Sequence, residues 1–485
     1  MKKYDLIIVG AGPSAVFCAY ELIKKNKLKN VLIIEQGKRI EDRFCPIEKA
    51  GKCLHCKPFC SITSGFSGAG AFSDGKLNSY HLSLHNQEGD LYLGGNGGGY
   101  IKQYMSSEDI KDLLAYTDEI YLSFGADPHL HGIDHRDEIV RLQRKAKEND
   151  LVLVDFPIRH LGTEKAHELY SKIEKFLEEN GVEMIFNTSV LDLIIEDGVA
   201  KGVAVCDVLN KKSFEIFSDK IVLGIGRKGA AWLSDICQRH NIETAVGSVD
   251  IGVRYELPDD VMREINTYLY EGKFIGRPKP FCDRVRTFCQ NPSGFVSAEV
   301  YDNNLTLVNG HSYKDRKSTN TNLAILVSHN FNTPFNKPIE YGENIAENVN
   351  RLAAGSVLVQ RFGDILNGKR TWERELLTNS VKPTLKSAVA GDITYAIGFR
   401  TMTDIINFIK QVDGVVPGFA GEDNLLYAPE IKFYSNTVVV DKNFQTSVKN
   451  LFCIGDGGGL TTGLMMASAS GVKMARNLIS LEDKN

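Results

Sequence analysis

Near its N-terminus the chain reads Leu6-Ile7-Ile8-Val9-Gly10-Ala11-Gly12-Pro13-Ser14-Ala15, and this stretch indicates the fold class. Its four leading apolar residues predict a short strand buried on both faces of a parallel sheet. The turn that follows matches G-x-G-x-x-G/A ahead of an expected helix. Such a turn lets the backbone approach a pyrophosphate, which then faces the positive end of the helix. We therefore predict a Rossmann-like domain that binds a dinucleotide through Gly10, Gly12, Pro13, Ser14 and Ala15.

A second expected strand, residues 31–35, supports this prediction. It ends on Glu35, whose carboxylate can accept a hydrogen bond from a ribose hydroxyl, and Gln36 follows at the same edge. The combination of strand, glycine turn, helix and second strand with a terminal acid is much more specific than the glycines alone. The competing interpretation is a glycine turn in another α/β fold.

The C-terminal end carries a further motif, an apolar strand that ends in Gly455-Asp456 and leads into a helix of small residues. This segment resembles the C-terminal flavin motif of the glutathione-reductase-like flavoproteins. The resemblance implies that Asp456 binds a ribityl hydroxyl and that the helix starting near Gly463 and Leu464 points at the flavin pyrimidine edge. A helix N-terminus stabilises the negative charge of a reduced flavin there. We expect FAD to be held between the N-terminal and C-terminal segments.

Several stretches together resemble a narrower group, the bacterial FAD-dependent (NAD(FAD)-utilising) dehydrogenases related to the glutathione-reductase-like enzymes. They are Cys53–Pro58, Ser64–Leu77, Arg286–Cys289, Val308–Ser312 and Leu426–Phe433. The resemblance implies FAD and redox chemistry but no particular substrate. Within the glycine-rich stretch, small residues favour close approach of the backbone to the flavin ring, against the alternative of a surface loop. The expected contacts are Ser67, Gly68, Ala69 and Gly70.

Two further positions complete the predicted cofactor site. Residues 220–226 resemble the strand and glycine turn that close the same domain in that family, which implies a contact at Gly226, and Val190 stands where the adenine-side strand would run. Gly224, Gly226 and Gly229 also spell G-x-G-x-x-G. This second motif is either the closing turn of the FAD domain or a pyridine-nucleotide site, which would make NAD(P)H the electron donor, but no clear second strand follows it.

The order of these elements predicts a discontinuous α/β architecture. Residues 1–80, 151–245 and 425–485 would form a Rossmann-like, three-layer ββα FAD-binding domain. Residues 81–150 would be a mostly helical insertion, and residues 246–424 a mixed α+β substrate domain. Helices are expected over 106–124 and 163–180, and an antiparallel meander of strands after residue 182.

Four of the ten cysteines, Cys45, Cys53, Cys56 and Cys60, fall in one short segment. Soft ligands at such spacing suit zinc or an iron–sulfur cluster, although the spacing matches no standard ferredoxin run. The alternative is a set of free thiols near the flavin. No pair of cysteines follows the first glycine turn, so disulfide-reductase chemistry is disfavoured.

Three residues are candidates for catalysis: Arg286 and His311 lie in the expected substrate domain, and Glu430 lies shortly after it. Arg286 can clamp a carboxylate or phosphate, and His311 or Glu430 can move a proton as hydride moves at the flavin. The favoured function is an FAD-dependent dehydrogenase or reductase acting on a small organic molecule. A flavin monooxygenase and a non-catalytic FAD-binding redox sensor or partner-binding protein remain as alternatives.

Composition narrows the other possibilities. The 485 residues carry a net charge of -4 without a long basic run, which argues against a nucleic-acid partner. No apolar stretch approaches the roughly twenty residues of a membrane helix, and the N-terminus does not look like a signal peptide. We expect a cytoplasmic protein, and the sequence predicts no oligomeric state.

Overall fold

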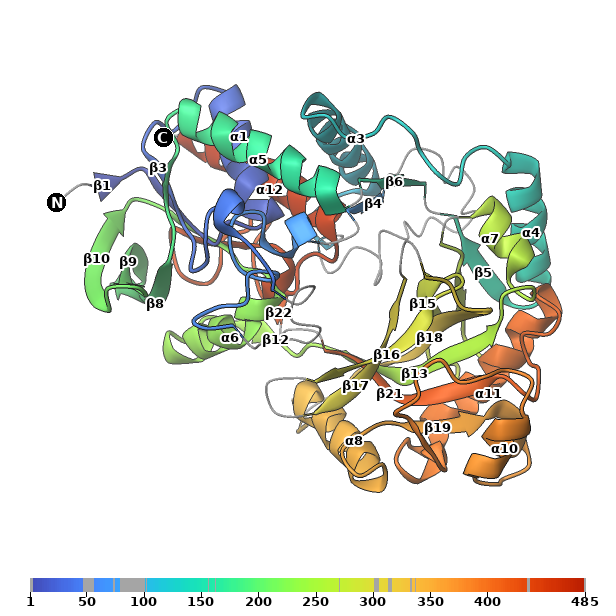
Figure 1. Ribbon diagram of the computed structural model, residues 1–485. Coiled ribbons are helices and arrows are strands. Elements are labelled where there is room, and N and C mark those ends of the chain that lie inside the picture. The colour runs from blue at the N-terminus through green and yellow to red at the C-terminus, as the bar shows by residue number, and fades with distance from the viewer. Residues whose placement is uncertain are drawn as a thin grey trace. The chain divides into compact units, whose positions relative to one another are not determined.

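The computed structural model divides the chain into two compact units, which are described separately. It describes residues 3–46, 56–72, 75–78, 101, 103–155, 157–161, 163–269, 271–300, 305–312, 316–331, 334–335, 337–433 and 437–483. The first unit comprises Met1–His131, Pro157–Ala245 and Ser435–Asn485, and the second comprises Gly132–Phe156 and Val246–Tyr434. Figure 1 labels the elements of both units.

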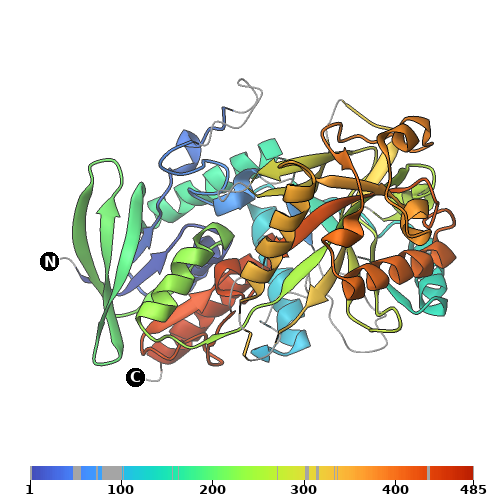
Figure 2. The same cartoon turned by 90° about the horizontal axis from the view of Figure 1, so that it is seen from below.

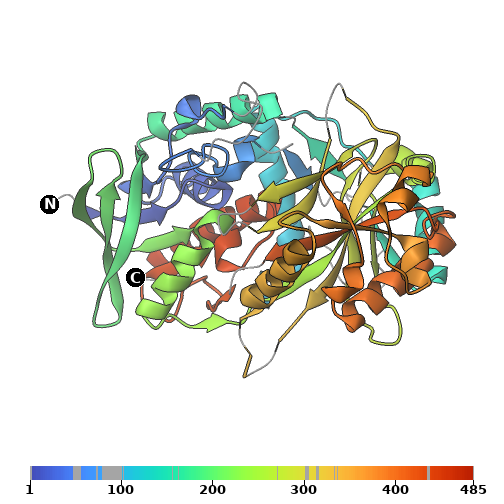
Figure 3. The same cartoon turned by 60° about the horizontal axis from the view of Figure 1, so that its bottom comes forward.

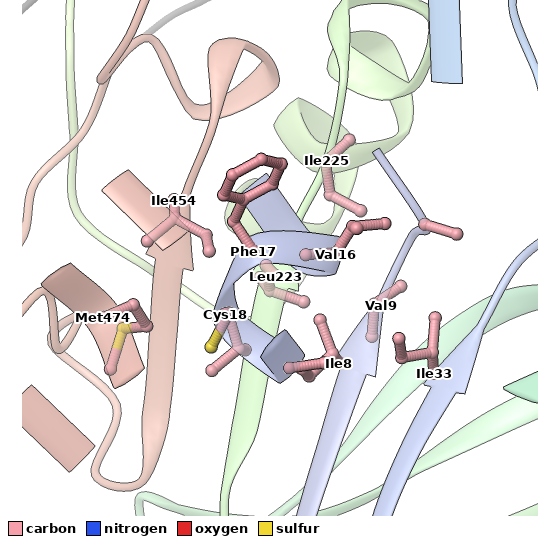
Figure 4. Packing of buried hydrophobic residues seen from close by; sticks show 14 of the residues in the cluster. Ile8, Val9, Val16, Phe17, Cys18, Ile33, Leu223, Ile225, Ile454 and Met474 are labelled. Atoms are coloured by element: carbon pink, nitrogen blue, oxygen red, sulfur yellow. The ribbon is translucent and has the colours of Figure 1, made fainter. Parts of the chain in front are cut away.

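A five-stranded parallel sheet forms the centre of the first unit. Its strands, in spatial order, are β23 (Leu451–Ile454), β11 (Ile221–Gly224), β2 (Leu6–Val9), β3 (Val31–Ile34) and β7 (Glu183–Ile185). Four of them are buried along their whole length, as expected for strands covered on both faces. The helices α1 (Pro13–Lys24) and α12 (Leu464–Glu482) pack against this core, and Figure 4 shows Val16, Phe17 and Cys18 of α1 beside Ile8, Leu223 and Ile454.

Helices α1 and α12 approach each other closely because Gly471 of α12, at their contact, has no side chain. A Cβ atom on Gly471 would lie 2.1 Å from the carbonyl oxygen of Ser14. Two further helices, α3 (Ser107–Ser123) and α5 (Thr163–Glu179), complete the layer. The hydroxyl of Tyr121 on α3 lies 2.9 Å from that of Tyr170 on α5 and 2.8 Å from that of Ser468 on α12. The N-terminus of α3 is capped, since the Ser106 side chain accepts from the amide of Asp109 at 3.1 Å.

The predicted meander forms a second sheet in the first unit, visible beside the N-terminus in Figure 2. Its order is β1 (Lys3–Tyr4), β10 (Lys212–Ser218), β9 (Val199–Asp207) and β8 (Thr188–Glu196). This unit also contains the strand pairs β4 (Lys76–Asn78) with β6 (Ile158–His160) and β12 (Thr244–Ala245) with β22 (Thr437–Val438), and the helix α6 (Ala230–Arg239).

An eight-stranded sheet organises the second unit. Its order is β20 (Val389–Ala390), β19 (Leu358–Arg361), β21 (Leu425–Phe433), β13 (Val249–Pro258), β18 (Asn320–His329), β15 (Val285–Asn291), β14 (Lys273–Gly276) and β5 (Leu151–Val154). The helices of the unit are α4 (Arg136–Glu148), α7 (Arg263–Tyr268), α8 (Pro338–Leu352), α9 (Phe362–Leu366), α10 (Glu373–Thr378) and α11 (Phe399–Val415), and β16 (Phe295–Val300) and β17 (Thr306–His311) form a hairpin. Figure 3 shows α8 alongside β21.

The two faces of this sheet differ in chemistry. Side chains at odd positions of β13, such as Ile251 and Val253, join an apolar cluster with Phe408 and Val412 of α11. Side chains at even positions, including Asp250 and Arg254, are also buried but are charged. Successive side chains of a strand point to opposite faces, so the charged side chains of β13 share one face of the sheet. Towards β19 the same face carries a smaller apolar cluster that includes Tyr427 and Val359.

The predicted fold class is confirmed: a Rossmann-like domain assembled from separated segments is joined to a second, mixed α+β unit. The expected domain boundaries are wrong in three places. Strands β5 and β21 were assigned to the FAD-binding domain, yet β5 pairs with β14 and β21 pairs with β13 in the second unit. The expected insertion, residues 81–150, also divides, because α3 packs on α12 and α4 packs on β5. Local sequence patterns identify strands and helices. They do not show which sheet a strand joins or which unit a helix packs against.

Candidate cofactor site and the charged face of the second unit

A cavity of about 830 Å³ lies in the first unit at the carboxyl ends of its parallel strands. Segments far apart in the sequence line it together. They are residues 9–14, 34–36, 63–64, 68–70, 188–191, 224–229, 232, 235, 239, 456, 463–464 and 467. In open α/β sheets, this edge is where ligands bind.

The first glycine turn has the geometry that a bound phosphate requires. Gly10 has a φ of +92°, and a Cβ there would lie 2.8 Å from the carbonyl oxygen of Gly224. A Cβ on Gly12, by contrast, would meet no protein atom within 4 Å. No side chain caps the N-terminus of α1, where Pro13 occupies the first turn. The helix therefore presents its N-terminal backbone amides to the cavity, as an anion site does.

Glu35 connects the glycine turn to two other loops. Its Oε2 accepts from the amide of Ala11 at 2.9 Å, and its Oε1 accepts from the amides of Gly37 at 2.8 Å and Gly65 at 2.9 Å. The carboxylate is buried, and its hydrogen bonds hold the two loops in place. An ionised carboxylate has about four acceptor sites, so Oε2 can still accept from a ribose hydroxyl.

The glycine-rich loop approaches the first turn as closely as its composition suggested. A Cβ on Gly68 would lie 3.4 Å from the Cα atom of Gly12, and the Ser67 amide donates to the carbonyl oxygen of Ala11 at 2.7 Å. A Cβ on Gly70 would lie 3.0 Å from the Leu464 side chain. Gly68, Ala69 and Gly70 line the cavity, whereas the fully buried Ser67 lies behind its wall.

Asp456 brings the C-terminal motif to the same cavity. Its Oδ1 accepts from the Thr461 hydroxyl at 2.7 Å, its Oδ2 accepts from the Gly463 amide at 3.3 Å, and Arg227 lies 3.6 Å away. Burial raises the pKa of the Asp456 carboxyl above its usual value, and Arg227 opposes that rise. Gly463, with a φ of +91°, immediately precedes α12 and gives it no side-chain cap, so a second helix N-terminus faces the cavity.

Most residues predicted to bind the cofactor lie on this cavity. They are Gly10, Gly12, Pro13, Ser14, Glu35, Gln36, Gly68, Ala69, Gly70, Val190, Gly226, Asp456, Gly463 and Leu464. Ala15, Ser67 and Gly455 do not line it, because they serve close packing instead: a Cβ on Gly224 would lie 3.1 Å from that of Ala15, and a Cβ on Gly455 would lie 2.8 Å from the Ser14 hydroxyl. Their contact with a cofactor stays a prediction.

The prediction missed a group of polar and aromatic lining residues, Arg227, Lys228, Trp232 and Arg239. Arg227 and Lys228 follow β11 within the Gly226-Arg227-Lys228-Gly229 segment, which was the available signal, and Trp232 and Arg239 lie on the next helix, α6. Gly224, Gly226 and Gly229 line the same cavity as the first glycine turn. In the structure the second G-x-G-x-x-G motif therefore forms part of the wall of the same cavity as the first motif.

The predicted metal ligands fall partly outside the described residues, which exclude Cys53. Cys45, Cys56 and Cys60 are free thiols, with Cys56 exposed. Within the part of the chain that the structure describes, no three His, Cys, Asp or Glu side chains gather as metal ligands would. Zinc or iron–sulfur binding stays a prediction.

The three candidate catalytic residues all belong to the second unit. Arg286 donates to Asp250 at 2.7 Å, and Glu430 lies 3.3 Å from the Lys432 ammonium and 3.7 Å from the Arg254 guanidinium. Both are buried on the charged face of the sheet. His311 ends β17 in an exposed position. The structure therefore groups Arg286 with Glu430 on one sheet face, and all three catalytic roles stay predictions.

The fold and the cavity together define a Rossmann-like protein whose first unit is shaped for a dinucleotide. No helix within the described ranges is long and apolar enough to cross a bilayer.

Comparison with known proteins agrees with that class. Residues 279–432, within the second unit, match the family model described as "FAD-dependent protein, C-terminal domain-like". A protein of Clostridium beijerinckii described as "Uncharacterized protein" is 23% identical over 513 residues, covering 98% of this chain and 81% of its own length.

Solved structures resemble the chain only distantly. FrdA of the E. coli quinol fumarate reductase shares 12% identity at a TM-score of 0.45, covering 100% of this chain and 71% of its own. Glycine oxidase from Bacillus cereus shares 11% identity at a TM-score of 0.35, covering 100% of this chain and 96% of its own. Similarity this low does not indicate which reaction a protein catalyses.

Proposed function

We propose that the protein is an FAD-dependent oxidoreductase that transfers hydride between the flavin and a small organic substrate. The observation that carries the proposal is the single cavity lined by the N-terminal glycine turn, the acid at the end of β3 and the Gly-Asp segment after β23. These are the positions that a dinucleotide with a ribityl chain needs. The family model that matches part of the second unit supports the same conclusion.

The residues present fit FAD at each part of the molecule. The uncapped N-terminus of α1 and the open space at Gly12 suit the pyrophosphate. Glu35 suits the ribose, and Asp456 suits a ribityl hydroxyl. The uncapped N-terminus of α12 suits the pyrimidine edge, where the reduced ring is negatively charged. This division of roles also favours the glutathione-reductase-like superfamily.

When bound, FAD supplies the hydride chemistry, and the protein supplies binding, orientation and electrostatics. In this chain the two helix N-termini would hold the negative charge of the pyrophosphate and of the ring. The Gly68–Gly70 backbone would contact the cofactor closely, because it carries almost no side chains.

The decisive measurement is the identity of the copurified cofactor. The purified protein should release FAD, and chromatography of the extract distinguishes FAD from FMN. FMN lacks the adenosine half and would leave the adenine side of the cavity, at Val190, empty. An extract with FMN alone, or with no flavin after reconstitution with excess FAD, would contradict the proposal.

A further inference from the structure

Helix α6 presents two chemically different sides to its surroundings. One side, which includes Leu233 and Ile236, is buried in the apolar core of the first unit. The side chains of Trp232, Asp235 and Arg239 line the cavity instead. Their spacing of three and then four residues places them on one side of the helix. This side of α6 forms a wall of the cavity that the two glycine motifs do not explain.

Strand β8 continues this wall. Residues 188–191 line the same cavity. Arg239, at the end of α6, donates to the carbonyl oxygen of Leu191 at 3.3 Å and to a carboxylate oxygen of Asp192 at 2.5 Å. The His240 ring nitrogen lies 2.6 Å from the other oxygen of that carboxylate. These interactions fix the helix to the strand beside the cavity, and both elements are labelled in Figure 1.

Trp232 offers the cavity a ring surface and not a hydrogen-bond donor. Its side chain is partly buried and packs against the apolar core of the first unit. The indole nitrogen is enclosed by protein atoms and has no acceptor among the residues that the structure describes. The part of Trp232 that a ligand can reach is therefore the carbon framework of the ring. Such a surface favours contact with another flat aromatic group.

The adenine ring is the part of FAD that such a surface fits. The pyrophosphate suits the N-terminus of α1, the ribityl chain suits Asp456, and the flavin ring suits the N-terminus of α12 and the small residues of the glycine-rich loop. Adenine is the remaining aromatic group of the cofactor. Val190, which the sequence assigns to the adenine side, belongs to the β8 part of the same wall.

We propose that Trp232 contacts the adenine ring of FAD and is the residue through which the protein selects FAD over FMN. The inference rests on the proposed function and adds to it a residue that determines cofactor specificity. FMN ends at its phosphate and has no adenosine half, so it makes no contact with the wall of α6 and β8. The contact with Trp232 therefore strengthens the binding of FAD alone.

Tryptophan fluorescence tests the contact directly, because the chain contains only two tryptophans. The other one, Trp372, is half-exposed and belongs to the second unit. In Trp372→Phe, all tryptophan emission comes from Trp232. ADP, which carries adenine without a flavin, should quench this emission when it is titrated into the full-length apoprotein. In Trp232→Phe, ADP should leave the emission of Trp372 unchanged.

This readout separates contact from a structural role. Adenine does not absorb where tryptophan emits, so it quenches the emission only when it touches the indole ring. A tryptophan that merely supports the wall would not respond. If ADP leaves the emission of Trp372→Phe unchanged, the inference is overturned, whether or not ADP competes with FAD.

Substitutions test the consequence for affinity. Trp232→Leu should weaken FAD binding about five- to a hundredfold and leave FMN binding unchanged, so the ratio of the two affinities should fall by that factor. Trp232→Phe should retain most of the FAD affinity, because it keeps an aromatic ring. Trp372→Leu makes the same change in the second unit and should alter neither affinity. An unchanged ratio in Trp232→Leu would refute the role of Trp232.

The same measurements distinguish this inference from the proposed function. Flavin content and far-UV circular dichroism are recorded for every variant. A protein that binds FAD equally well with Trp232→Leu defeats only this inference. A wild-type protein that binds no FAD defeats the proposed function.

Discussion

Gly12 shows how one residue separates cofactor binding from folding. At Gly10 and Gly471 a Cβ atom would clash with the backbone of a neighbouring segment. Substitution at these glycines would therefore disturb the packing of the first unit. At Gly12 a Cβ would extend only into the cavity. The backbone of Gly12, with φ of -72° and ψ of 175°, is also one that any residue can adopt. Its missing side chain therefore serves the ligand.

We predict that Gly12→Val abolishes FAD retention without unfolding the protein, because the branched side chain would occupy the place of the pyrophosphate. Flavin absorbance per chain and far-UV circular dichroism are the measurements. Gly398→Val is the matched control: Gly398 also precedes a helix with extended backbone, and a Cβ there also meets nothing within 4 Å. Bound FAD at wild-type stoichiometry in Gly12→Val would contradict the site.

At the scale of elements, the segment from Cys45 to Cys60 joins the ribose-side strand β3 to the glycine-rich loop. Its described ends are held by Arg43, which donates to the carbonyl oxygens of Ser61 and Ile62 at 2.9 Å. Burial lowers the pKa of Arg43 to about 10, while Glu35 and Cys60 oppose that shift. Arg43 thus connects the chain just before Cys45 to the chain just after Cys60.

If Cys45, Cys53, Cys56 and Cys60 bind a metal, elemental analysis of protein purified without air should find it. About one zinc per chain would indicate a closed structural site. Iron with acid-labile sulfide would indicate a cluster able to pass single electrons to the flavin. As a control, Cys206→Ser removes a thiol on β9 and should leave the metal content unchanged. Absence of both metals would contradict the prediction and leave free thiols.

At the scale of the whole molecule, the cavity draws on segments that are separated by much of the chain. The lining runs from residue 9 to residue 467 and lies entirely within the first unit. A ligand that contacts all of these segments binds only the folded arrangement. Binding of this kind shifts the folding equilibrium toward the native state.

We therefore predict that removing FAD lowers the midpoint of thermal unfolding and that FAD restores it in a concentration-dependent way. The expected gain in the free energy of unfolding is about 2.7 kcal/mol when free FAD is about one hundred times its dissociation constant. Differential scanning fluorimetry of apoprotein titrated with FAD measures it, with FMN as the control that lacks the adenine half. If the midpoint of thermal unfolding does not change with FAD concentration, the cofactor does not bind the folded first unit as proposed.

The features that could be predicted from the sequence are local ones. The apolar run Leu6–Val9, the glycine turn after it and the Gly455-Asp456 segment each carry a chemical requirement within a few residues, so they identified the Rossmann-like unit and most of its cavity lining. Arg286 and Glu430 are candidates on the chemistry of their side chains alone, because a guanidinium can clamp a carboxylate or phosphate and a carboxylate can move a proton.

Tertiary structure decided which of these segments meet. The pairing of β21 with β13 carries Glu430 into the second unit, and a row of three pairings across β18 and β13 places it on the face that also carries Arg286. Hydrogen bonds between distant strands depend on long-range register, which no short window of sequence encodes. The same holds for the Phe288 ring on β15, which lies 5.4 Å from the Lys273 ammonium on β14 and 5.7 Å from the Lys432 ammonium on β21. These contacts exist only once the whole sheet has formed.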